Sequence, residues 1–596
     1  MTAAEQKELR LFAVKVREGI LRGTHAAKSG HPGGSLSSAD YFTYLYKKEI
    51  RVDPKNPHDP NRDRFVLSKG HVAPGLYATL ANCGFFPVEE LLTLRHIGSR
   101  LQGHPNMNLT PGIDMSTGSL GQGLSTAAGM AKGAKYLGKD INVYTLLGDG
   151  ELAEGQIWEA TMFAAHYGLD NLCIAVDVNG LQIDGKTADV MNSAPVDKKF
   201  EAFGCAVQWI DGHDFTALAS AFHTFHANQG SKKPTVILMK TVKGKDVSFM
   251  ENQAGWHGKA PNDAELAQGL EDLAAEEHRG GMSMAEVKKI ATRESYGNGL
   301  VELGKEHDNV VVLDADLAGA TKTAIFKKAF PDRHFNCGIA ECNLVDVGAG
   351  LSTMGLVPFV STFAMFAAGR AYEQVRNTIG YPHLNVKICA THGGISVGED
   401  GASHQCCEDF ALMRTVPGMT VMCPSDDVEA RKMLHAAYEM DGPVYIRFGR
   451  AATPVYHAED FPFVVGKGEV LQDGTDVAVI ATGILVPEAI EAGKRLAAEG
   501  ISTRVINMAT IKPLDTEIVL RAARECGKIV TVEEHNIIGG LGEAVCAALA
   551  EGCPVPVRRV GVNDVFGHSG PAAELLKEFG LTADHIAEAA RTLAGK

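Results

Sequence analysis

The stretch INVYTLLGDGELAEGQIWEATMFAAHYGLDNLCIAVDVN, residues 141–179, decides the fold class. Its two ends, INVYTLL and NLCIAVDVN, are near-continuous apolar runs, which are typical of parallel strands covered on both faces. Between them, GQIWEATMFAAHYGL has the pattern of a helix that stops at Gly168. Two buried strands joined by a helix form a βαβ unit, so the stretch predicts an α/β fold with a parallel sheet.

The turn after the first of these strands carries the first functional signal. Residues 148–153, GDGELA, match the relaxed dinucleotide pattern G-x-G-x-x-A. A pyrophosphate at such a turn lies directly on the backbone, and Asp149 would repel it unless a cation came between them. Mg²⁺ binds oxygen ligands and joins carboxylates to phosphates, and Asn179 ends the adjacent strand. We therefore predict a cation that bridges the protein to a diphosphate, with a metal-free nicotinamide oxidoreductase as an alternative.

The bulk composition is that of an acidic globular chain. The 596 residues are 45% hydrophobic and 22% charged, which is ordinary for a chain that buries large cores. The length predicts roughly two to four structural units. The net charge is −15 and no long basic tract occurs, so binding to nucleic acid or to a membrane surface is not expected.

Cysteine usage and the N-terminal segment predict a cytoplasmic protein. The 12 cysteines are scattered and form no C-x-x-C pair, which favours free thiols in a reducing compartment. Residues 1–19 form a charged amphipathic helix without the apolar core of a signal peptide. Residues 347–369 contain no charge, but glycines, a proline and hydroxyl residues interrupt them, so we expect a helix end and a short buried strand.

Changes in composition divide the chain into domains. We expect a first domain at residues 1–265, a linker at 266–283, a second domain at 284–455 and a third at 456–596. The linker is acidic and Ala-rich, and the text GGMSMAEVKK that follows looks like the start of an independent chain. We hypothesise that two separately encoded halves were joined here, by nature or in the laboratory. Nicking near Gly281 that left no active two-part complex would count against this.

Motifs along the whole chain resemble those of the transketolase family. Together with Asp149 and Asn179 they occur in family order, from about residue 9 to the end. The motifs are SGHPGGSLSSAD (29–40), LSKGHVAPGLYA (67–78), GHPNMNLTPGIDMSTGSLGQG (103–123), WHGKAP (256–261), ATRESYG (291–297), GIAECN (338–343), STFAMF (361–366), THGGISVGEDGASHQ (391–405) and IRFGR (446–450).

The resemblance implies a fold and an activity. The fold would be two doubly wound thiamine-diphosphate-binding domains, one for the diphosphate and metal and one for the pyrimidine, followed by a smaller α/β C-terminal domain. The activity would be reversible transfer of a two-carbon ketol unit from a ketose phosphate, such as xylulose 5-phosphate, to an aldose phosphate, such as ribose 5-phosphate or erythrose 4-phosphate. The transfer would pass through an enamine on thiamine diphosphate. Transketolases are homodimers with active sites at the subunit interface, and we expect the same here.

The resemblance also implies which residues hold the cofactor. Mg²⁺, or Ca²⁺ or Mn²⁺ in its place, would be bound by Asp149, Asn179 and the backbone carbonyl of Leu181. Phe366 would stack on the pyrimidine ring with Phe363 beside it. The full set of expected cofactor contacts is Gly118, Leu120, Gly148, Asp149, Gly150, Glu154, Asn179, Lys243, Phe363 and Phe366, with Glu154 also placed at the subunit interface.

The catalytic groups follow from the same resemblance. Glu341 would bond the aminopyrimidine ring and promote the imino tautomer that deprotonates the thiazolium carbon. His71 and His257 are expected near the diphosphate and the reacting centre, and His31, His104 and His404 near the sugar hydroxyls. Imidazole titrates near neutral pH and can therefore act as a general acid–base. The expected catalytic set is Glu341, His31, His71, His104, His257 and His404.

Sugar phosphates also need cationic contacts. By the resemblance, Arg293 and Arg450 match family phosphate contacts. Arginine suits this role, because its planar guanidinium offers paired donors to a phosphate. Where many transketolases carry a phosphate-binding serine, this sequence has Ala320, which leaves the preferred sugars open. The expected substrate contacts are His31, His104, His257, Arg293, His392, Asp400, His404 and Arg450.

Three alternatives remain at this point. The nearest enzyme is 1-deoxyxylulose-5-phosphate synthase, which shares GIAE and the diphosphate motif, but WHGKAP and GEDGASHQ are transketolase-like. The second alternative is a transketolase variant for an unusual sugar. The third is an inactive cofactor-binding homologue, which predicts the loss of Asp149, Glu341 or the histidines, all of which are present.

Overall fold

The computed structural model describes residues 2–274 and 289–595, and the chain divides into two compact units. Unit 1 contains residues 1–284 with 338–340 and 399–403, and unit 2 contains the remainder. In the expected linker, the residues up to 274 belong to helix α10 (Asp263–Ala274). The rest of that linker, Gly281 included, lies outside the described residues.

Unit 1 is built on a five-stranded parallel sheet with the order β1-β2-β3-β7-β6. The strands are β1 (Arg64–Leu67), β2 (Val143–Gly148), β3 (Leu172–Val178), β7 (Thr235–Lys240) and β6 (Ala206–Asp211). The helices are α1 (Ala3–Ala26), α2 (Pro32–Ser37), α3 (Ala39–Tyr44), α4 (Ala73–Asn82), α5 (Gly123–Tyr136), α6 (Gly155–His166), α7 (Thr187–Val190), α8 (Val196–Ala202), α9 (Phe215–Ala227) and α10. The predicted βαβ unit is confirmed as β2–α6–β3, with Gly168 at φ +59° after the helix.

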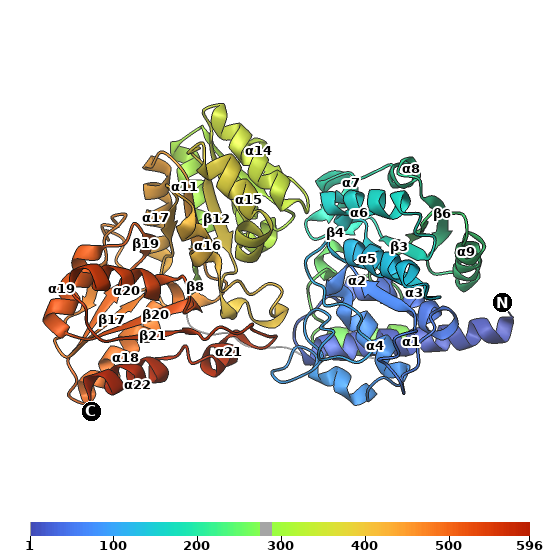
Figure 1. Ribbon diagram of the computed structural model, residues 1–596, viewed down its shortest axis with the longest axis horizontal. Coiled ribbons are helices and arrows are strands. Elements are labelled where there is room, and N and C mark those ends of the chain that lie inside the picture. The colour runs from blue at the N-terminus through green and yellow to red at the C-terminus, as the bar shows by residue number, and fades with distance from the viewer. Residues whose placement is uncertain (1, 275–288, 596) are drawn as a thin grey trace. The chain divides into compact units, whose positions relative to one another are not determined.

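Helices cover both faces of this sheet, which explains the unbroken apolar runs of its strands (Figure 1). Alternate residues of a strand point to opposite faces. In β2, Tyr144 and Leu146 enter one core with residues of α1, α4 and α9. Val143 and Leu147 enter a second core with residues of α5, α6 and α8. The sheet edge where β2 and β3 end carries the turn at Asp149, after which the short helix η4 (Gly150–Ala153) begins.

Unit 2 contains a seven-stranded sheet with the order β10-β9-β11-β12-β14-β13-β19, parallel except for β19. The strands are β9 (Val310–Asp314), β10 (His334–Asn336), β11 (Val357–Phe363), β12 (Lys387–Thr391), β13 (Thr420–Met422), β14 (Val444–Phe448) and β19 (Thr510–Lys512). The helices beside it are α11 (Thr292–Glu306), α12 (Ala318–Thr321), α13 (Thr323–Ala329), α14 (Glu341–Thr353), α15 (Tyr372–Gln374), α16 (Asp409–Thr415) and α17 (Asp427–Glu439). A short antiparallel pair joins β8 (Ile290–Ala291) to β15 (Ala452–Thr453).

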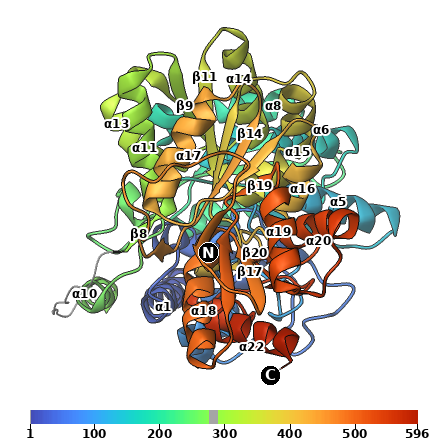
Figure 2. The ribbon, with the colours of Figure 1, turned by 90° about the vertical axis from the view of Figure 1, so that its left-hand side faces the viewer.

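A second sheet of unit 2 forms the C-terminal part of the chain. Its order is β16-β18-β17-β20-β21, parallel except for the edge strand β16. The elements are β16 (Glu469–Gln472), β17 (Val477–Ala481), β18 (Thr503–Asn507), β20 (Ile529–Asn536), β21 (Val557–Val562), α18 (Val486–Ala498), α19 (Thr516–Cys526), α20 (Leu541–Gly552), α21 (Ala572–Glu578) and α22 (Ala583–Ala594). Helices α19 and α20 lie on one face of the sheet and α18 and α22 on the other (Figures 1 and 2).

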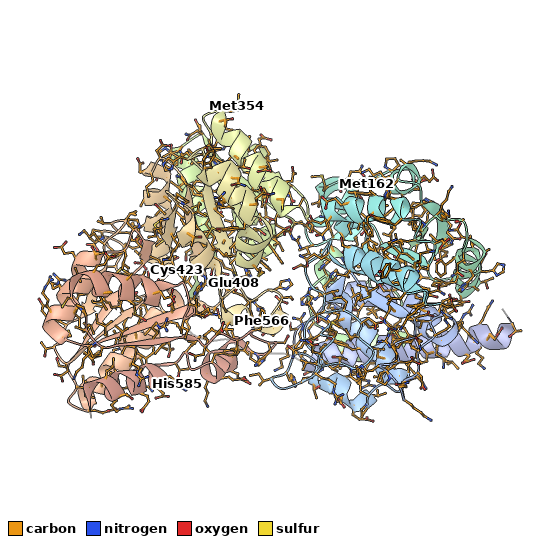
Figure 3. All side chains as sticks on the ribbon, in the orientation of Figure 1. Met162, Met354, Glu408, Cys423, Phe566 and His585 are labelled. Carbon is orange, nitrogen blue, oxygen red and sulfur yellow. The ribbon has the colours of Figure 1, made fainter. Side chains whose placement is uncertain are left out.

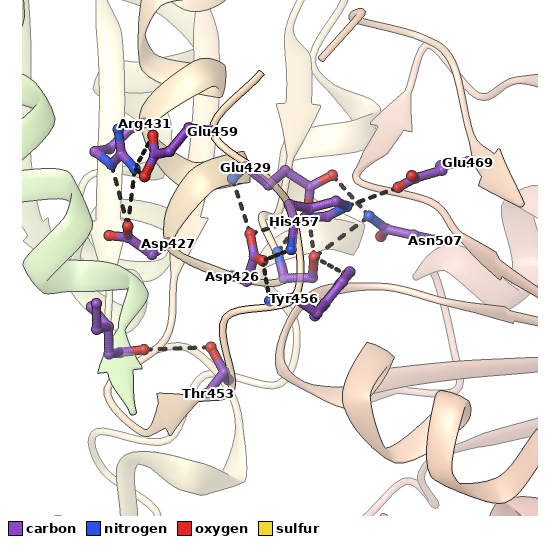
Figure 4. Close-up of polar contacts among 12 residues, drawn as sticks. Asp426, Asp427, Glu429, Arg431, Thr453, Tyr456, His457, Glu459, Glu469 and Asn507 are labelled. Carbon is purple, nitrogen blue, oxygen red and sulfur yellow. Dashed lines mark hydrogen bonds and ion pairs between the residues drawn. The ribbon is translucent and has the colours of Figure 1, made fainter. Parts of the chain in front are cut away.

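Two features tie the C-terminal sheet to the seven-stranded sheet within unit 2. The stretch STRVINMATIKP, expected in the third α/β segment, splits into β18 and β19, and β19 pairs with β13 of the other sheet. Next to this crossover, His457 bonds Asp426 at 2.9 Å through Nδ1 and Glu469 at 2.8 Å through Nε2 (Figure 4). Burial opposes protonation, but these two carboxylates raise the pKa of His457 to about 9. A protonated histidine therefore joins the two parts.

The expectation for the uncharged stretch is confirmed. The uncharged stretch at residues 347–369 is the end of α14 followed by the buried strand β11. No described helix is long and apolar enough to cross a membrane. All 12 cysteines are free thiols. The chain is a mixed α/β protein with parallel sheets, as the opening stretch predicted.

Candidate active site

The ends of β2 and β3 bring together the three groups predicted to bind a metal. The strands are parallel neighbours with Gly148 opposite Asp177, so the residues that follow them meet at one sheet edge. Asp149 accepts hydrogen bonds from the backbone N–H of Gly150 at 2.9 Å and of Gly180 at 2.6 Å. Gly180 lies between Asn179 and Leu181, so the carboxylate contacts the turn that carries the other two predicted ligands.

Buried side chains hold this turn in place. Asn179 donates through Nδ2 to Asp177 at 3.1 Å, which turns its amide oxygen away from that carboxylate. Asp177 is itself paired with the ammonium of Lys69 at 2.5 Å. The backbone carbonyl of Leu181 accepts a hydrogen bond from the ammonium of Lys243 at 3.2 Å, so a cationic group already lies against this predicted ligand.

The chemistry of these donors fits a divalent cation. Burial, and next the charge of Asp177, raise the pKa of Asp149 to about 6, because an ionised carboxylate is poorly solvated here. A bound cation would supply the missing counter-charge. Carboxylate, amide and carbonyl oxygens are the ligands of Mg²⁺ and Ca²⁺. Among the described residues, no group of three or more His, Cys, Asp or Glu could hold a metal ion, and the set proposed here contains only one such residue.

The other two carboxylates of the opening stretch have different surroundings. Glu151 accepts hydrogen bonds from Ser68 Oγ at 2.5 Å and from the N–H of Gly121 at 2.8 Å through one oxygen, and from the N–H of Gly148 at 3.0 Å through the other. Glu154 lies against Gly121, where a Cβ would come within 2.1 Å of its Cγ. Gly121 has φ +92°, so only glycine suits this close approach. The hydrogen bonds of Glu151 to Ser68 and Gly121 tie the turn to the end of β1 and to the loop before α5.

Four of the predicted histidines form one cluster in unit 1. His31 precedes α2, and its ring centroid lies 5.2 Å from that of His71, 5.5 Å from that of His257 and 6.3 Å from that of His104. The rings of His71 and His257 stack at 4.9 Å. The ammonium of Lys243 donates to His257 Nδ1 at 2.7 Å, which leaves the proton of the neutral ring on Nε2.

Burial changes what two of these histidines can do. Burial, followed by neighbouring imidazoles and ammonium groups, lowers the pKa of His71 and His257 well below the usual range. The sequence-based assumption that His71 and His257 titrate near neutral pH is therefore wrong for these two residues. Both are neutral at physiological pH, so each ring has one N–H donor and one acceptor nitrogen. In His257 the acceptor Nδ1 already bonds Lys243, which leaves its Nε2–H for a ligand.

Unit 2 contains the second set of predicted residues, which begins with Glu341. Glu341 is the first residue of α14 and is 2% exposed. Its Oε2 accepts a hydrogen bond from Arg370 Nη1 at 2.8 Å. The Arg370 guanidinium also lies 5.3 Å from the ring centre of Phe366, a cation–π distance. The glutamate therefore has a positive partner from its own unit and lies beside the aromatic residue predicted to stack on the cofactor.

The aromatic residues of STFAMF form a stack with two histidines. The rings of Phe363 and Phe366 are nearly parallel, with centroids 5.9 Å apart. His392 stacks on Phe363 at 3.9 Å, and His404 contacts Phe366 edge-on at 5.3 Å. Phe363 ends β11 and His392 follows β12, and these strands are neighbours in the sheet. The sheet edge therefore gathers these four rings from distant parts of the sequence.

Two arginines and His392 form a positive cluster in unit 2. Arg293 donates through Nη1 to the carbonyl of Ala320 at 3.0 Å and contacts His392 Nε2 at 3.2 Å. Because the guanidinium can only donate, His392 Nε2 is an acceptor, and its Nδ1 bonds Thr391 Oγ1 at 2.8 Å. Burial, and next the charge of Arg450, lower the pKa of Arg293. An anion bound between these two positive groups would offset their mutual repulsion.

The remaining predicted residues have simple positions. Arg450 follows β14 and donates to the carbonyl of Val397. Asp400 ends the short helix η9 (Ile395–Asp400). Gly118 and Leu120 lie in the loop before α5. The first set, with Asp149 and the cluster of four histidines, belongs to unit 1, and the second, with Glu341, His392 and the arginines, belongs to unit 2.

Sequence reasoning missed three residues that surround the turn predicted to bind the metal. Lys69 and Asp177 form the buried ion pair behind Asn179. A lysine inside LSKGH and an aspartate inside an apolar strand were visible signals, because such residues are rarely buried without a partner. Gln182 is 3% exposed, and among the described residues its amide oxygen and nitrogen have no hydrogen-bond partner. It lies against Gly150, and its amide is available to a ligand.

Three family descriptions match successive parts of the chain. "Transketolase, thiamine diphosphate binding domain" matches residues 13–300, "Transketolase, pyrimidine binding domain" matches residues 288–455, and "Transketolase, C-terminal domain" matches residues 466–586. The matches follow the same order along the chain as the motifs.

Similar proteins agree with these descriptions. The chain is 40% identical to Transketolase-like protein 2 of Mus musculus over 97% of this chain and 96% of that protein. It is 39% identical to Transketolase of Homo sapiens over 98% of this chain and 97% of that protein. It is 51% identical to a putative transketolase C-terminal section of Methanocaldococcus jannaschii over 50% of this chain and 94% of that protein. The chain therefore belongs to the transketolase family of thiamine-diphosphate-binding enzymes.

Proposed function

We propose that this protein is a transketolase that moves a two-carbon ketol unit from a ketose phosphate to an aldose phosphate. One observation carries the proposal. In unit 2, the positive cluster of Arg293, Arg450 and His392 connects, through the stack of His392 on Phe363, with the aromatic residues next to Glu341. A site that binds a phosphate next to a cofactor-stacking surface suits a phosphorylated sugar whose carbonyl end reacts on the cofactor.

Thiamine diphosphate, when bound, supplies the electron sink for breaking and forming the carbon–carbon bond. Glu341 would accept or donate a proton at the aminopyrimidine ring. Phe366 and Phe363 would provide the surface on which that ring stacks. Arg370 keeps Glu341 in place through its hydrogen bond.

The metal and diphosphate belong to unit 1 in this proposal. Asp149, Asn179 and the Leu181 carbonyl would hold Mg²⁺ or a similar cation, supported by the raised pKa of Asp149 and by the oxygen donors of the turn. Lys243 and Gln182 would contact the diphosphate. The neutral rings of His71 and His257 would accept and donate hydrogen bonds near the reacting centre, and His31 and His104 would contact sugar hydroxyls.

In unit 2, Arg293, Arg450 and His392 would bind the sugar phosphate. His404, also in unit 2, and Asp400, which belongs to unit 1, would contact sugar hydroxyls. His392 presents a neutral ring with a defined tautomer, so it accepts from Arg293 and leaves the arginine's other donors free to reach a phosphate. Ala320 contributes a carbonyl rather than a hydroxyl at this place, so the phosphate would rest mainly on the two arginines.

A homodimer with active sites completed by both subunits is part of the proposal. Large apolar side chains are exposed on the neighbouring helices α5 and α6 of unit 1. Tyr136 at the end of α5 is 85% exposed, and Met162 and Phe163 on α6 are 55% and 40% exposed. Figure 3 labels Met162. Exposed apolar patches on neighbouring helices mark protein–protein interfaces. They support a subunit interface on this face of unit 1.

Product analysis with xylulose 5-phosphate and ribose 5-phosphate tests the function. We expect sedoheptulose 7-phosphate and glyceraldehyde 3-phosphate only when thiamine diphosphate and a divalent cation are both present. Omission of the cofactor, and treatment with EDTA, are the controls. Pyruvate with glyceraldehyde 3-phosphate is the contrasting substrate pair. A product from that pair, and none from the sugar phosphates, would identify a 1-deoxyxylulose-5-phosphate synthase instead.

A further inference from the structure

The C-terminal sheet of unit 2 supports the segment that carries His392. This segment, residues 391–398, is here named the substrate loop. It leaves β12 at Thr391, places His392 on Phe363 and continues into η9. After Thr391, the last residue of β12, the loop backbone belongs to neither sheet, so its position depends on what lies behind it.

Glu534 of β20 is the group directly behind the substrate loop. Its Oε1 accepts a hydrogen bond from the backbone N–H of Ser396 at 2.5 Å. Gly394 in the same loop has φ +78°, and a Cβ there would come within 2.3 Å of the Glu534 Cδ. The loop backbone therefore lies against the carboxyl group and leaves no room for a side chain between them.

Arg447 of β14 holds the backbone of Glu534 and the backbone of Cys406, to which the substrate loop is bonded. It donates to the carbonyl of Glu534 at 2.6 Å through Nη1 and to the carbonyl of Cys406 at 2.9 Å through Nη2. Cys406 in turn accepts from the N–H of Gly394 at 2.7 Å. Asp409 holds the guanidinium through Nε at 2.9 Å and Nη2 at 2.5 Å. The substrate loop, β14 and β20 thus share one network of hydrogen bonds.

The surroundings keep Glu534 at this position. It is 4% exposed, and the cavity beside it, which Cys423 (labelled in Figure 3) also lines, measures about 10 Å³, the room that about one water molecule needs. The carboxyl is therefore largely shielded from bulk solvent. Burial raises the pKa of Glu534 to about 7, because the charged form is poorly solvated.

From this network we infer that Glu534 is a positioning residue for sugar-phosphate binding, acting through the Ser396 N–H on the substrate loop and so on His392. The inference rests on the proposed function. It gives the C-terminal sheet a part in substrate recognition, although Glu534 itself contacts no substrate. Loss of the Glu534 carboxyl would loosen the substrate loop and weaken phosphate binding. The turn of unit 1 that is predicted to bind the metal would be unaffected.

Glu534→Met removes the acceptor at nearly constant volume, and Glu534→Gln keeps an oxygen that can accept from Ser396. Glu533→Met is the matched control, because this neighbouring buried carboxylate accepts from the N–H of Leu541 and Gly542 at the start of α20 instead. Hydrogen exchange of the peptide that spans residues 391–398, followed by mass spectrometry, reports on the loop. Steady-state kinetics with xylulose 5-phosphate and titration of thiamine diphosphate report on binding.

We expect Glu534→Met to speed exchange in residues 391–398 and to raise KM for the sugar phosphate by about 10- to 100-fold, the effect of losing one hydrogen bond to a charged acceptor. The kcat and the affinity for thiamine diphosphate should stay within about twofold, a range that corresponds to less than 1 kcal/mol. Glu534→Gln should restore both exchange and KM. Glu533→Met should change exchange around residues 539–545 only.

Exchange of residues 391–398 that is the same in Glu534→Met as in wild type overturns the inference, as does an unchanged KM. If Glu534→Met does not fold, Gly394→Ala displaces the carboxyl from the loop side and should give the same exchange and KM changes. A wild-type protein without two-carbon transfer refutes the proposed function, and the exchange comparison of the Met and Gln variants still tests the loop contact by itself.

Discussion

Two buried carboxylates, Asp149 in unit 1 and Glu341 in unit 2, satisfy their charge in different ways. Glu341 is paired with Arg370, a fixed cation from its own unit, at 2.8 Å. The two hydrogen bonds of Asp149 come from the backbone N–H groups of Gly150 and Gly180, and burial raises its pKa to about 6. Backbone dipoles stabilise a buried charge less than a full counter-charge does.

The difference indicates what each carboxylate is prepared to meet. Asp149 lacks a full counter-charge and suits a ligand that brings one, which is a divalent cation. Glu341 already has a positive partner and suits a neutral ligand with which it exchanges a proton. Under the proposed function, the Asp149 turn of unit 1 would serve cofactor binding and the Glu341 region of unit 2 would serve proton transfer. Substitutions at the two positions should therefore separate turnover from affinity.

The largest expected effect is on turnover. Glu341→Gln keeps an oxygen for Arg370 but cannot take or hold the proton of the aminopyrimidine ring. We expect kcat to fall by about 10²- to 10⁴-fold, the range for loss of a general acid–base. The affinity for thiamine diphosphate, measured by fluorescence titration, should change little. Wild-type turnover in this variant would remove Glu341 from the mechanism and break the comparison.

The next effect is on cofactor affinity. Asp149→Asn removes the charge that attracts the metal, so metal-dependent binding of thiamine diphosphate should weaken by at least about 10- to 100-fold, the cost seen even for residues that only support a ligand. In the wild type, metal affinity should also fall as pH drops below about 6, because the cation must then displace a proton from Asp149. Calorimetric titration of Mn²⁺ or Mg²⁺ measures both. Unchanged affinity in the variant would show that Asp149 is not a metal ligand.

The smallest expected effect is on stability and concerns His457, a partner of two carboxylates that can lose its own charge. His457 between Asp426 and Glu469 has a folded-state pKa of about 9, raised above the ordinary value of 6.5. Its contribution to stability is therefore full below pH 6.5 and is lost as pH rises through 9. We expect His457→Gln to lower Tm by about 2–4 °C at pH 6 and by less at pH 10. The same decrease at both pH values would mean that the charge of His457 contributes nothing.

The strands that carry the site could be read from the sequence with good accuracy. VPFVSTF is β11 residue for residue. The ends of INVYTLL and NLCIAVDVN differ from those of β2 and β3 by one or two residues. These strands are buried on both faces, so nearly every residue must be apolar and the pattern is unambiguous. Strand β19 was not separated from β18, because its pairing with β13 of another sheet is a long-range contact that leaves no local pattern.

The sequence by itself determined the fold class, the chemistry expected at Asp149 and the family, since these depend on residue types at short spacings. It could not determine the ionisation of His71 and His257, the pairing of Glu341 with Arg370 or the support of the substrate loop by Glu534. Each of these depends on groups distant in the chain that share one poorly solvated space, and both desolvation and charge–charge interactions depend on distance in space. Only the tertiary structure brings those groups together.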